Sequence, residues 1–112
     1  MSARERVEEL LKPDGEVIGV RPRPNSNVRR VASLAPVEDA RETFERLAEL
    51  GHDYSDESPS RGSRPGRLVE IPDLGYVGYR ETPTPTVDVN VIIEGLSNVK
   101  FKFVGEFGRE SQ

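Results

Sequence analysis

The chain has 112 residues, a formal net charge of −4, no cysteine and one histidine. This length corresponds to one domain, and the absence of cysteine excludes a disulfide framework, a thiolate metal site and a thiol nucleophile. The mean hydropathy is −0.61, and no apolar run approaches the ~20 residues of a membrane-spanning helix. We therefore expect a single domain over residues 1–112, without membrane insertion and without a signal peptide at Met1.

The first predicted element is a short helix within residues 1–16. Ser2 and Glu5 form an S-x-x-E capping box, in which the two side chains bond each other's backbone at the start of a helix. An apolar stripe at helical spacing follows, formed by Val7, Leu10 and Leu11. The sequence Pro-Asp-Gly at residues 13–15 ends this helix, because proline and glycine favour a turn.

Residues 17–51 are predicted to hold two short strands and the main helix. The strands are expected over Glu16–Val20 and Val28–Ser33, and the two prolines between them interrupt regular structure because they lack a backbone donor. The main helix is expected over about 36–50. Its apolar face is formed by Val37, Ala40, Phe44, Leu47 and Ala48. Gly51 stands where a glycine commonly ends a helix.

Residues 52–66 are rich in serine, glycine, proline and charge, and we expect a long loop there. The sole histidine, His52, lies at its start, followed by Asp53, Asp56 and Glu57. The spacing of these four residues matches no common ligand set, so neither a metal nor a cofactor is expected. Histidine is the residue type whose charge changes near neutral pH, which makes His52 a candidate base; the alternative is a cation placed favourably after a helix end.

From residue 67 onward the apolar residues recur with a period of two. Four strands are expected, over Arg67–Ile71, Tyr76–Thr82, Thr86–Ile93 and Val99–Val104. They make up an antiparallel sheet over residues 67–104, and residues 105–112 form a tail. Helices followed by strands joined through short turns predict an α+β fold, in which the N-terminal helices pack on one face of a four-stranded antiparallel sheet.

Alternation along the predicted strands sorts their side chains into two faces. One face is rich in valine and phenylalanine, and we expect it to pack on the helices. The opposite face is polar and carries Arg80, Thr82, Thr86, Asp88, Asn90, Lys100 and Lys102. Gly78 leaves room beside Arg80. This polar face is either a phosphate-binding surface or the ordinary solvated face of an antiparallel sheet.

The charges of the chain are unevenly distributed. Residues 17–37 contain four arginines and no acidic residue, whereas residues 38–57 contain eight acidic and two basic residues. The four arginines are Arg21, Arg23, Arg29 and Arg30. A negative net charge argues against a simple nucleic-acid-binding protein. A local basic segment can still attract phosphate, because salt screens the more distant charges.

The polar face contains the residue types that RNA cleavage without a metal requires. The 2′-hydroxyl must lose a proton, the charge on phosphorus must meet fixed donors, and the 5′-oxygen must gain a proton. The planar fork of Arg80 suits two phosphate oxygens, Lys102 can stabilise the phosphate or the leaving oxygen, and the Thr82 and Thr86 hydroxyls are candidate donors. Each of these residues also has a structural explanation. Arg80 could pair with Asp88 across the sheet, and Lys102 could be an edge lysine that prevents aggregation. The two threonines could be present because threonine favours strands.

Three sequence motifs follow one another in the second half of the chain. They are Gly66–Arg80 (GRLVEIPDLGYVGYR), Pro85–Asn90 (PTVDVN) and Val99–Phe103 (VKFKF). Upstream, the elements at residues 17–19 and 27–29 and the helix ending at Gly51 precede them. This series, over about residues 17–103, resembles the C-terminal toxin domains of bacterial polymorphic toxins of the contact-dependent growth inhibition and Rhs types. Many such domains are similar to the barnase, EndoU, colicin and RelE group of ribonucleases.

The resemblance implies helices packed on a four-stranded antiparallel sheet and metal-independent cleavage of RNA, with tRNA as the expected substrate. It also implies that the domain is secreted as part of a larger carrier protein and acts in the cytoplasm of a target bacterium. A cognate immunity protein is the expected inhibitor, and no cofactor is implied.

The polar positions that match the family are Arg29, Arg80, Thr86, Asp88 and Lys102. The catalytic candidates are Arg80, Lys102, Thr86, Arg29 and Thr82. The substrate-binding candidates are Lys100, Asp88, Asn90, Arg30 and His52. The sequence departs from its relatives in the link at residues 81–85, which lacks their Ser/Lys/Gly-rich character, and at Lys102, where relatives often have a histidine. The general base is therefore not assigned, and a structural ion pair is the alternative for Arg29.

Two other functions stay open at the level of sequence. The first is a non-catalytic binding module that uses the basic residues 21–30 and the polar face to bind an acidic or nucleic-acid partner. The second is a DNA nuclease, which would need metal ligands that the sequence does not display.

Overall fold

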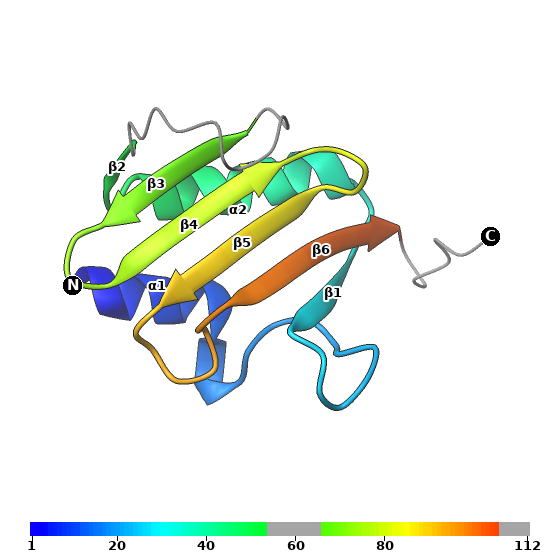
Figure 1. Cartoon of the computed structure of the whole chain (residues 1–112), viewed down its shortest axis with the longest axis horizontal. Coiled ribbons are helices and arrows are strands. Elements are labelled where there is room, and N and C mark those ends of the chain that lie inside the picture. Colours follow the sequence, from blue (N-terminus) through cyan, green and yellow to red (C-terminus); the bar gives the residue numbers. More distant parts are fainter. Residues whose placement is uncertain (54–65, 106–112) are drawn as a thin grey trace.

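The computed structural model describes residues 1–53 and 66–105, which form an α+β fold. The helices are α1 (Ala3–Leu11) and α2 (Pro36–Ala48), with a single 3-10 turn, η1 (Pro13–Gly15), between them. The strands are β1 (Val28–Ser33), β2 (His52–Asp53), β3 (Arg67–Ile71), β4 (Gly75–Arg80), β5 (Thr86–Val91) and β6 (Val99–Gly105). Both helices lie on the same side of the sheet, behind it in Figure 1. The predicted α+β class is thus confirmed.

Across the described residues, the sheet has six strands in the order β1-β6-β5-β4-β3-β2. The run from β3 to β6 is an antiparallel meander. At one edge β1 pairs in parallel with β6, and at the other edge β2 pairs antiparallel with β3. The prediction of a four-stranded, wholly antiparallel sheet is therefore wrong. The parallel pair is possible because β1 leads into α2, which carries the chain along the back of the sheet before the meander begins.

The limits of the meander strands follow the sequence pattern closely. β3 spans the predicted residues, Arg67–Ile71, whereas β4 and β5 each end two residues earlier than predicted. β4 stops at Arg80 because prolines follow at positions 83 and 85, and proline cannot donate to a ladder. β5 stops at Val91, whose carbonyl accepts a bond from the Ile93 N–H within a tight turn.

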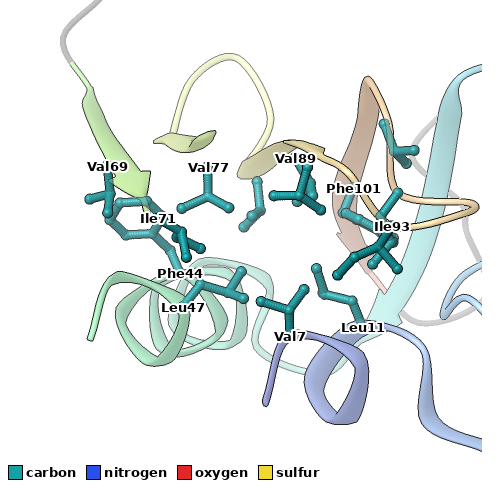
Figure 2. Close-up of a cluster of buried hydrophobic side chains, with 14 of the residues drawn as sticks. Val7, Leu11, Phe44, Leu47, Val69, Ile71, Val77, Val89, Ile93 and Phe101 are labelled. Atoms are coloured by element: carbon teal, nitrogen blue, oxygen red, sulfur yellow. The ribbon is translucent and has the colours of Figure 1, made fainter. Parts of the chain in front are cut away.

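The core fills the space between the two helices and the back of the sheet (Figure 2). α1 contributes Val7 and Leu11, and α2 contributes Phe44 and Leu47, all fully buried. From the sheet side they meet an apolar surface that includes Val69, Ile71, Val77, Val87, Val89 and Phe101. The apolar face of the helices and the apolar face of the sheet thus pack against each other, as we expect from the sequence.

The predicted capping box at the start of α1 is confirmed. The Glu5 N–H donates to Ser2 Oγ at 3.1 Å, and the Ser2 N–H donates to Glu5 Oε1 at 2.9 Å. α2 starts differently, because Ala35 at its N-cap has no capping oxygen. The side chain of Ser33 makes the hydrogen bonds at this helix start. Its hydroxyl donates to the Asp39 carboxylate at 2.5 Å and accepts from the Ala35 N–H at 2.9 Å. No helix among the described residues is long and apolar enough to cross a membrane.

The predicted strand over Glu16–Val20 is wrong. Only Val20 pairs with a strand, through a single antiparallel bridge to Arg30. Gly19 has a φ of +84°, a left-handed conformation that interrupts an extended segment and that glycine adopts easily. The carbonyls of residues 17–19 bond instead to the Arg29 guanidinium.

Gly51 is required by a close approach of two backbones. A Cβ at this position would stand 1.9 Å from the Glu70 carbonyl oxygen, so a side chain cannot be accommodated without moving β3. The chain then enters β2 directly, and His52 and Asp53 pair with Glu70 and Val69. The predicted loop therefore begins later than residue 52. Its remainder over residues 54–65, and the predicted tail over residues 106–112, lie outside the described residues.

Candidate functional site

The face of the sheet opposite the helices carries most of the polar residues singled out in the sequence. Residues that pair directly across a sheet point to the same face. One such line of pairs crosses four adjacent strands: Arg30 on β1, Lys102 on β6, Thr86 on β5 and Arg80 on β4. We call this line the cationic row and this side of the sheet the open face. No helix among residues 1–53 and 66–105 covers the open face (Figure 1).

The next line of pairs on the open face is centred on Asp88. Its carboxylate lies 3.4 Å from Arg80 Nη1 through one oxygen and 3.4 Å from Lys100 Nζ through the other. The three side chains are each about one third exposed, at 31%, 34% and 38% for Arg80, Asp88 and Lys100. Asp88 therefore joins the cationic row to the neighbouring Lys100. The predicted alternative, an ion pair between Arg80 and Asp88, is present in the structure.

Lys102 differs from Arg80 in its polar contacts. Within the described ranges, its ammonium group has no ion pair or hydrogen bond to another residue. Its strand is separated from that of Arg80 by β5 alone, which places the two Cα atoms about 10 Å apart. Both side chains are long enough to reach inward from that separation, so a ligand centred above Thr86 is accessible to both charges.

Thr86 forms the floor between these two cations. It is 1% exposed, and its hydroxyl donates to the Thr84 carbonyl oxygen at 2.7 Å. The hydroxyl hydrogen is thus committed to the turn between β4 and β5. Thr86 fixes the base of the row rather than offering a free donor. Thr82, the other candidate hydroxyl, lies beyond the end of β4 in the same turn.

Gly78 does not open a hollow beside Arg80, contrary to our expectation from the sequence. The residue itself is buried. A Cβ placed on it would stand 3.6 Å from Leu68 Cδ1 and 3.7 Å from Asp88 Cβ, which are ordinary contact distances. The Leu68 and Asp88 side chains therefore close over this position, and the surface between Arg80 and Asp88 is filled.

His52 lies on the open face but at its far edge. It pairs with Glu70, and the same line continues through Tyr76 to Asn90. The His52 Nε2 atom is 3.6 Å from Glu70 Oε1. Three strands separate β2 from β6, so the imidazole and the Lys102 ammonium do not meet over one phosphate. The structure thus separates His52 and Asn90 from the cationic row.

Arg29 lies on the helix side of the sheet, away from the cationic row. It pairs with Phe101, whose side chain is in the core. Its guanidinium donates to the carbonyls of Ile18 at 2.8 Å, Gly19 at 3.1 Å and Val17 at 3.3 Å. These bonds hold the segment before β1 in place. The structure therefore gives Arg29 a structural role, although its partners are carbonyls and not the carboxylate that we considered as an alternative.

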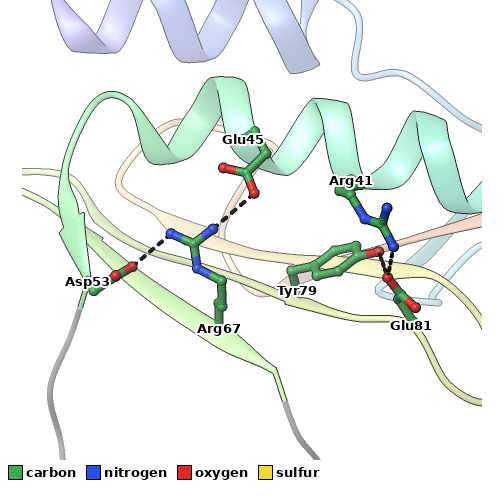
Figure 3. Close-up of polar contacts among 6 residues, drawn as sticks. All are labelled: Arg41, Glu45, Asp53, Arg67, Tyr79 and Glu81. Carbon is green, nitrogen blue, oxygen red and sulfur yellow. Dashed lines mark hydrogen bonds and ion pairs between the residues drawn. The ribbon is translucent and has the colours of Figure 1, made fainter.

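A network that the sequence analysis did not identify anchors the end of β4 to α2 (Figure 3). Glu81 accepts hydrogen bonds from the Tyr79 hydroxyl at 2.9 Å and from the Arg41 guanidinium. The bond from Arg41 lowers the pKa of Glu81, with the Tyr79 hydroxyl adding to the effect. Burial raises the pKa of Tyr79, and its bond to Glu81 adds to this. Tyr79 and Glu81, which flank Arg80, are thus linked by hydrogen bonds to each other and to Arg41 of α2.

A second network lies about one turn further along the same helix (Figure 3). The Arg67 guanidinium donates to Glu45 and to Asp53, each at 2.9 Å. The bond to Asp53 raises the pKa of Arg67. Arg67 also lies 5.1 Å from the centre of the Phe44 ring, and this ring stacks on Tyr79 at 5.5 Å. The sequence analysis placed Phe44 correctly, as part of the apolar face of the main helix, but did not predict its contact with Arg67.

No protein-family model, curated protein or solved structure matches this chain.

Proposed function

We propose that the chain is a metal-independent ribonuclease domain whose cleavage site is the open face between Arg80 and Lys102. One observation carries this proposal: the two cations extend from the same face of the sheet on either side of Thr86, with Asp88 in contact with one of them. A phosphodiester placed above Thr86 would meet a planar fork on one side and an ammonium group on the other. This arrangement can stabilise the negative charge that develops on phosphorus.

The residues around this position suggest a division of labour. Asp88 forms an ion pair with Arg80 and would accept the proton of the 2′-hydroxyl. The 2′-oxygen then bonds to phosphorus, the bond from phosphorus to the 5′-oxygen breaks, and Lys102 gives a proton to that leaving oxygen. The products are a 2′,3′-cyclic phosphate and a free 5′-hydroxyl. A positioned acid or base typically contributes about 10²–10⁴-fold to the rate.

The biological setting of this activity comes from the family resemblance. We propose that the domain is the toxic end of a larger secreted effector, that it cleaves tRNA in the cytoplasm of a target bacterium, and that a cognate immunity protein neutralises it. The ordered motifs over residues 17–103 support this assignment.

A non-catalytic RNA-binding or acidic-partner-binding module is the second candidate. It is favoured by one observation and by one departure from the family that the chain resembles. The Thr86 hydroxyl is already bonded to Thr84, and Lys102 stands where domains of that family often have a histidine. Such a module would bind without turnover, and its affinity would fall as the salt concentration rises.

The test is incubation of the purified chain with total tRNA in buffer containing EDTA. Cleavage that persists with EDTA and is lost in Arg80→Gln supports the ribonuclease. The matched control is Arg46→Gln, which removes the same charge from α2, where Arg46 pairs with Glu42 at 2.8 Å. Binding without cleavage by the wild-type chain would favour the binding module, and cleavage that EDTA abolishes would contradict the metal-independent mechanism.

A further inference from the structure

In the part of the chain that the structure describes, the cationic row continues past the proposed cleavage position toward β1. Toward β1, the next position after Lys102 is Arg30, paired with it in register. Toward β3, the residue beside Arg80 is Gly66, whose absent Cβ would stand 3.7 Å from the Arg80 Cβ. Among residues 1–53 and 66–105, a charge therefore follows on the β1 side of the cleavage position, while the position beside Arg80 on the β3 side is a glycine.

The backbone of Arg30 is held from both sides. On one side β1 pairs with β6, and on the other the Arg30 N–H donates to Val20 O at 2.8 Å while the Val20 N–H donates to Arg30 O at 2.9 Å. Arg30 is consequently held in place although β1 is the edge strand of the sheet. Adjacent strands lie about 4.8 Å apart, so the side chain of Arg30 can reach a group beyond the one that Lys102 contacts.

The remaining lines of the open face are less suited to a second polynucleotide backbone. The line next to the cationic row contains Asp88, whose carboxylate forms an ion pair with Lys100. The line after it contains Glu70. Both carboxylates repel phosphate. A duplex would present two phosphate backbones to this face, whereas a single strand needs only one row of cations.

The geometry points to a single-stranded RNA that lies across the strands from β4 toward β1. Its scissile phosphate sits between Arg80 and Lys102, and its neighbouring phosphate binds Arg30. This inference rests on the proposed function, because it takes the cleavage position from it. It adds a second phosphate subsite and a preference for single-stranded over paired RNA.

Binding of RNA that cannot be cleaved tests the subsite separately from the chemistry. The probes are a dinucleotide and a hexanucleotide with 2′-O-methyl groups at every position, together with a hairpin of the same chemistry. Dissociation constants are measured over a series of potassium chloride concentrations for the wild-type chain, Arg30→Gln, Lys102→Gln and Arg46→Gln. Each phosphate contact on a single strand contributes about 0.7 to the slope of log K against log salt.

We expect Arg30→Gln to reduce the hexanucleotide slope by about 0.7 and to shrink the affinity advantage of the hexanucleotide over the dinucleotide. Lys102→Gln should weaken both ligands by a similar factor and preserve that advantage, and Arg46→Gln should change neither. The hairpin should bind the wild-type chain more weakly than the hexanucleotide.

An unchanged slope in Arg30→Gln, equal loss on both ligands in that variant, or a hairpin that binds as tightly as the single strand would overturn the inference. If the binding results contradict the inference but the wild-type chain cleaves tRNA in an Arg80-dependent manner, the proposed function stands and only the subsite fails. If the wild-type chain neither binds nor cleaves RNA, both fail.

Discussion

Arg29 and Arg30 are neighbours in the chain and point to opposite faces of the sheet. Arg29 turns toward the helix side and bonds three carbonyls of residues 17–19, whereas Arg30 stands on the open face beside Lys102. Sequence alone makes them equivalent members of one basic segment. Strand alternation separates their roles, and this separation leads to opposite expectations for the two substitutions.

We expect Arg29→Met to lower the free energy of unfolding by about 2 kcal/mol, because it leaves carbonyls without their charge-assisted donor while keeping an apolar stem. Arg30→Met should change it by about 0.5 kcal/mol or less, as for most exposed positions. Urea titration followed by circular dichroism measures both. Equal effects of the two substitutions would contradict the structural role that the hydrogen bonds assign to Arg29.

Phe44 joins the core to the Arg67 network, since its ring is buried, stacks on Tyr79 and lies under the Arg67 guanidinium. Phe44→Ala should lower the free energy of unfolding by about 3–5 kcal/mol, through lost burial and the cavity that remains. Phe44→Leu keeps most of the volume and should cost about 1.5 kcal/mol. Thermal and urea unfolding give these values, and a cost below about 1 kcal/mol for the alanine variant would show that Phe44 is not packed as described.

The Glu81 carboxylate should make the stability depend on pH in the acidic range. Its pKa is lowered in the folded chain, chiefly by the bond from Arg41. A group with a lowered folded pKa stabilises above its unfolded pKa, and that contribution is lost as the pH falls through the folded value. The wild-type chain should therefore lose stability below about pH 4 more steeply than Glu81→Gln.

The control for this comparison is Glu49→Gln, an exposed glutamate at the C-cap of α2. It removes the same charge and should leave the acidic slope of the wild-type chain in place. Urea midpoints measured from neutral to acidic pH give the slopes. Identical slopes in the wild-type chain and Glu81→Gln would refute a bonded Glu81.

Tyr79 should act in the opposite direction at alkaline pH. Burial raises its pKa, so the neutral phenol is favoured in the folded chain. The resulting stabilisation is present below the ordinary tyrosine pKa and is lost as the pH rises through the raised value. We expect a late-ionising tyrosine in the ultraviolet absorbance titration that disappears in Tyr79→Phe. A titration curve that keeps this late component in the variant would assign it to another tyrosine.

The parts of the fold that depend on local sequence could be predicted. The capping box of Ser2 and Glu5 and the limits of β3 follow from residue type and period, and the structure confirms them. The parallel pairing of β1 with β6 could not be predicted, because it joins segments about seventy residues apart and no local pattern encodes it. The close approach at Gly51 is another such case: the sequence marks a helix end, but only the packed structure shows Glu70 against it.

The candidate site divides in the same way. Alternation was sufficient to predict that Arg80, Asp88 and Lys102 share a face, since each strand was identified correctly around them. The partners of Arg29 could not be predicted, because the neighbouring segment was expected to be a strand and instead wraps around its guanidinium. The bond that commits the Thr86 hydroxyl to Thr84 depends on the shape of a turn, which strand propensity does not describe.

Asp88→Asn tests the assignment of the general base most directly. The amide keeps the size of the side chain and removes its ability to take a proton, so cleavage should fall by about 10²-fold or more. RNA binding should become tighter, because a negative charge leaves the open face. Stability should change by about 1 kcal/mol or less, since the pairs with Arg80 and Lys100 are partly exposed.

Glu70→Gln is the matched control, since it removes a carboxylate from the same face but two lines of pairs away from Arg80. It should tighten RNA binding slightly and leave the cleavage rate within about twofold, an effect too small for a lost base. Single-turnover rates and dissociation constants measured on both variants separate the two effects. Cleavage by Asp88→Asn at the wild-type rate would remove Asp88 as the base, while the charge arrangement between Arg80 and Lys102 would still account for phosphate binding.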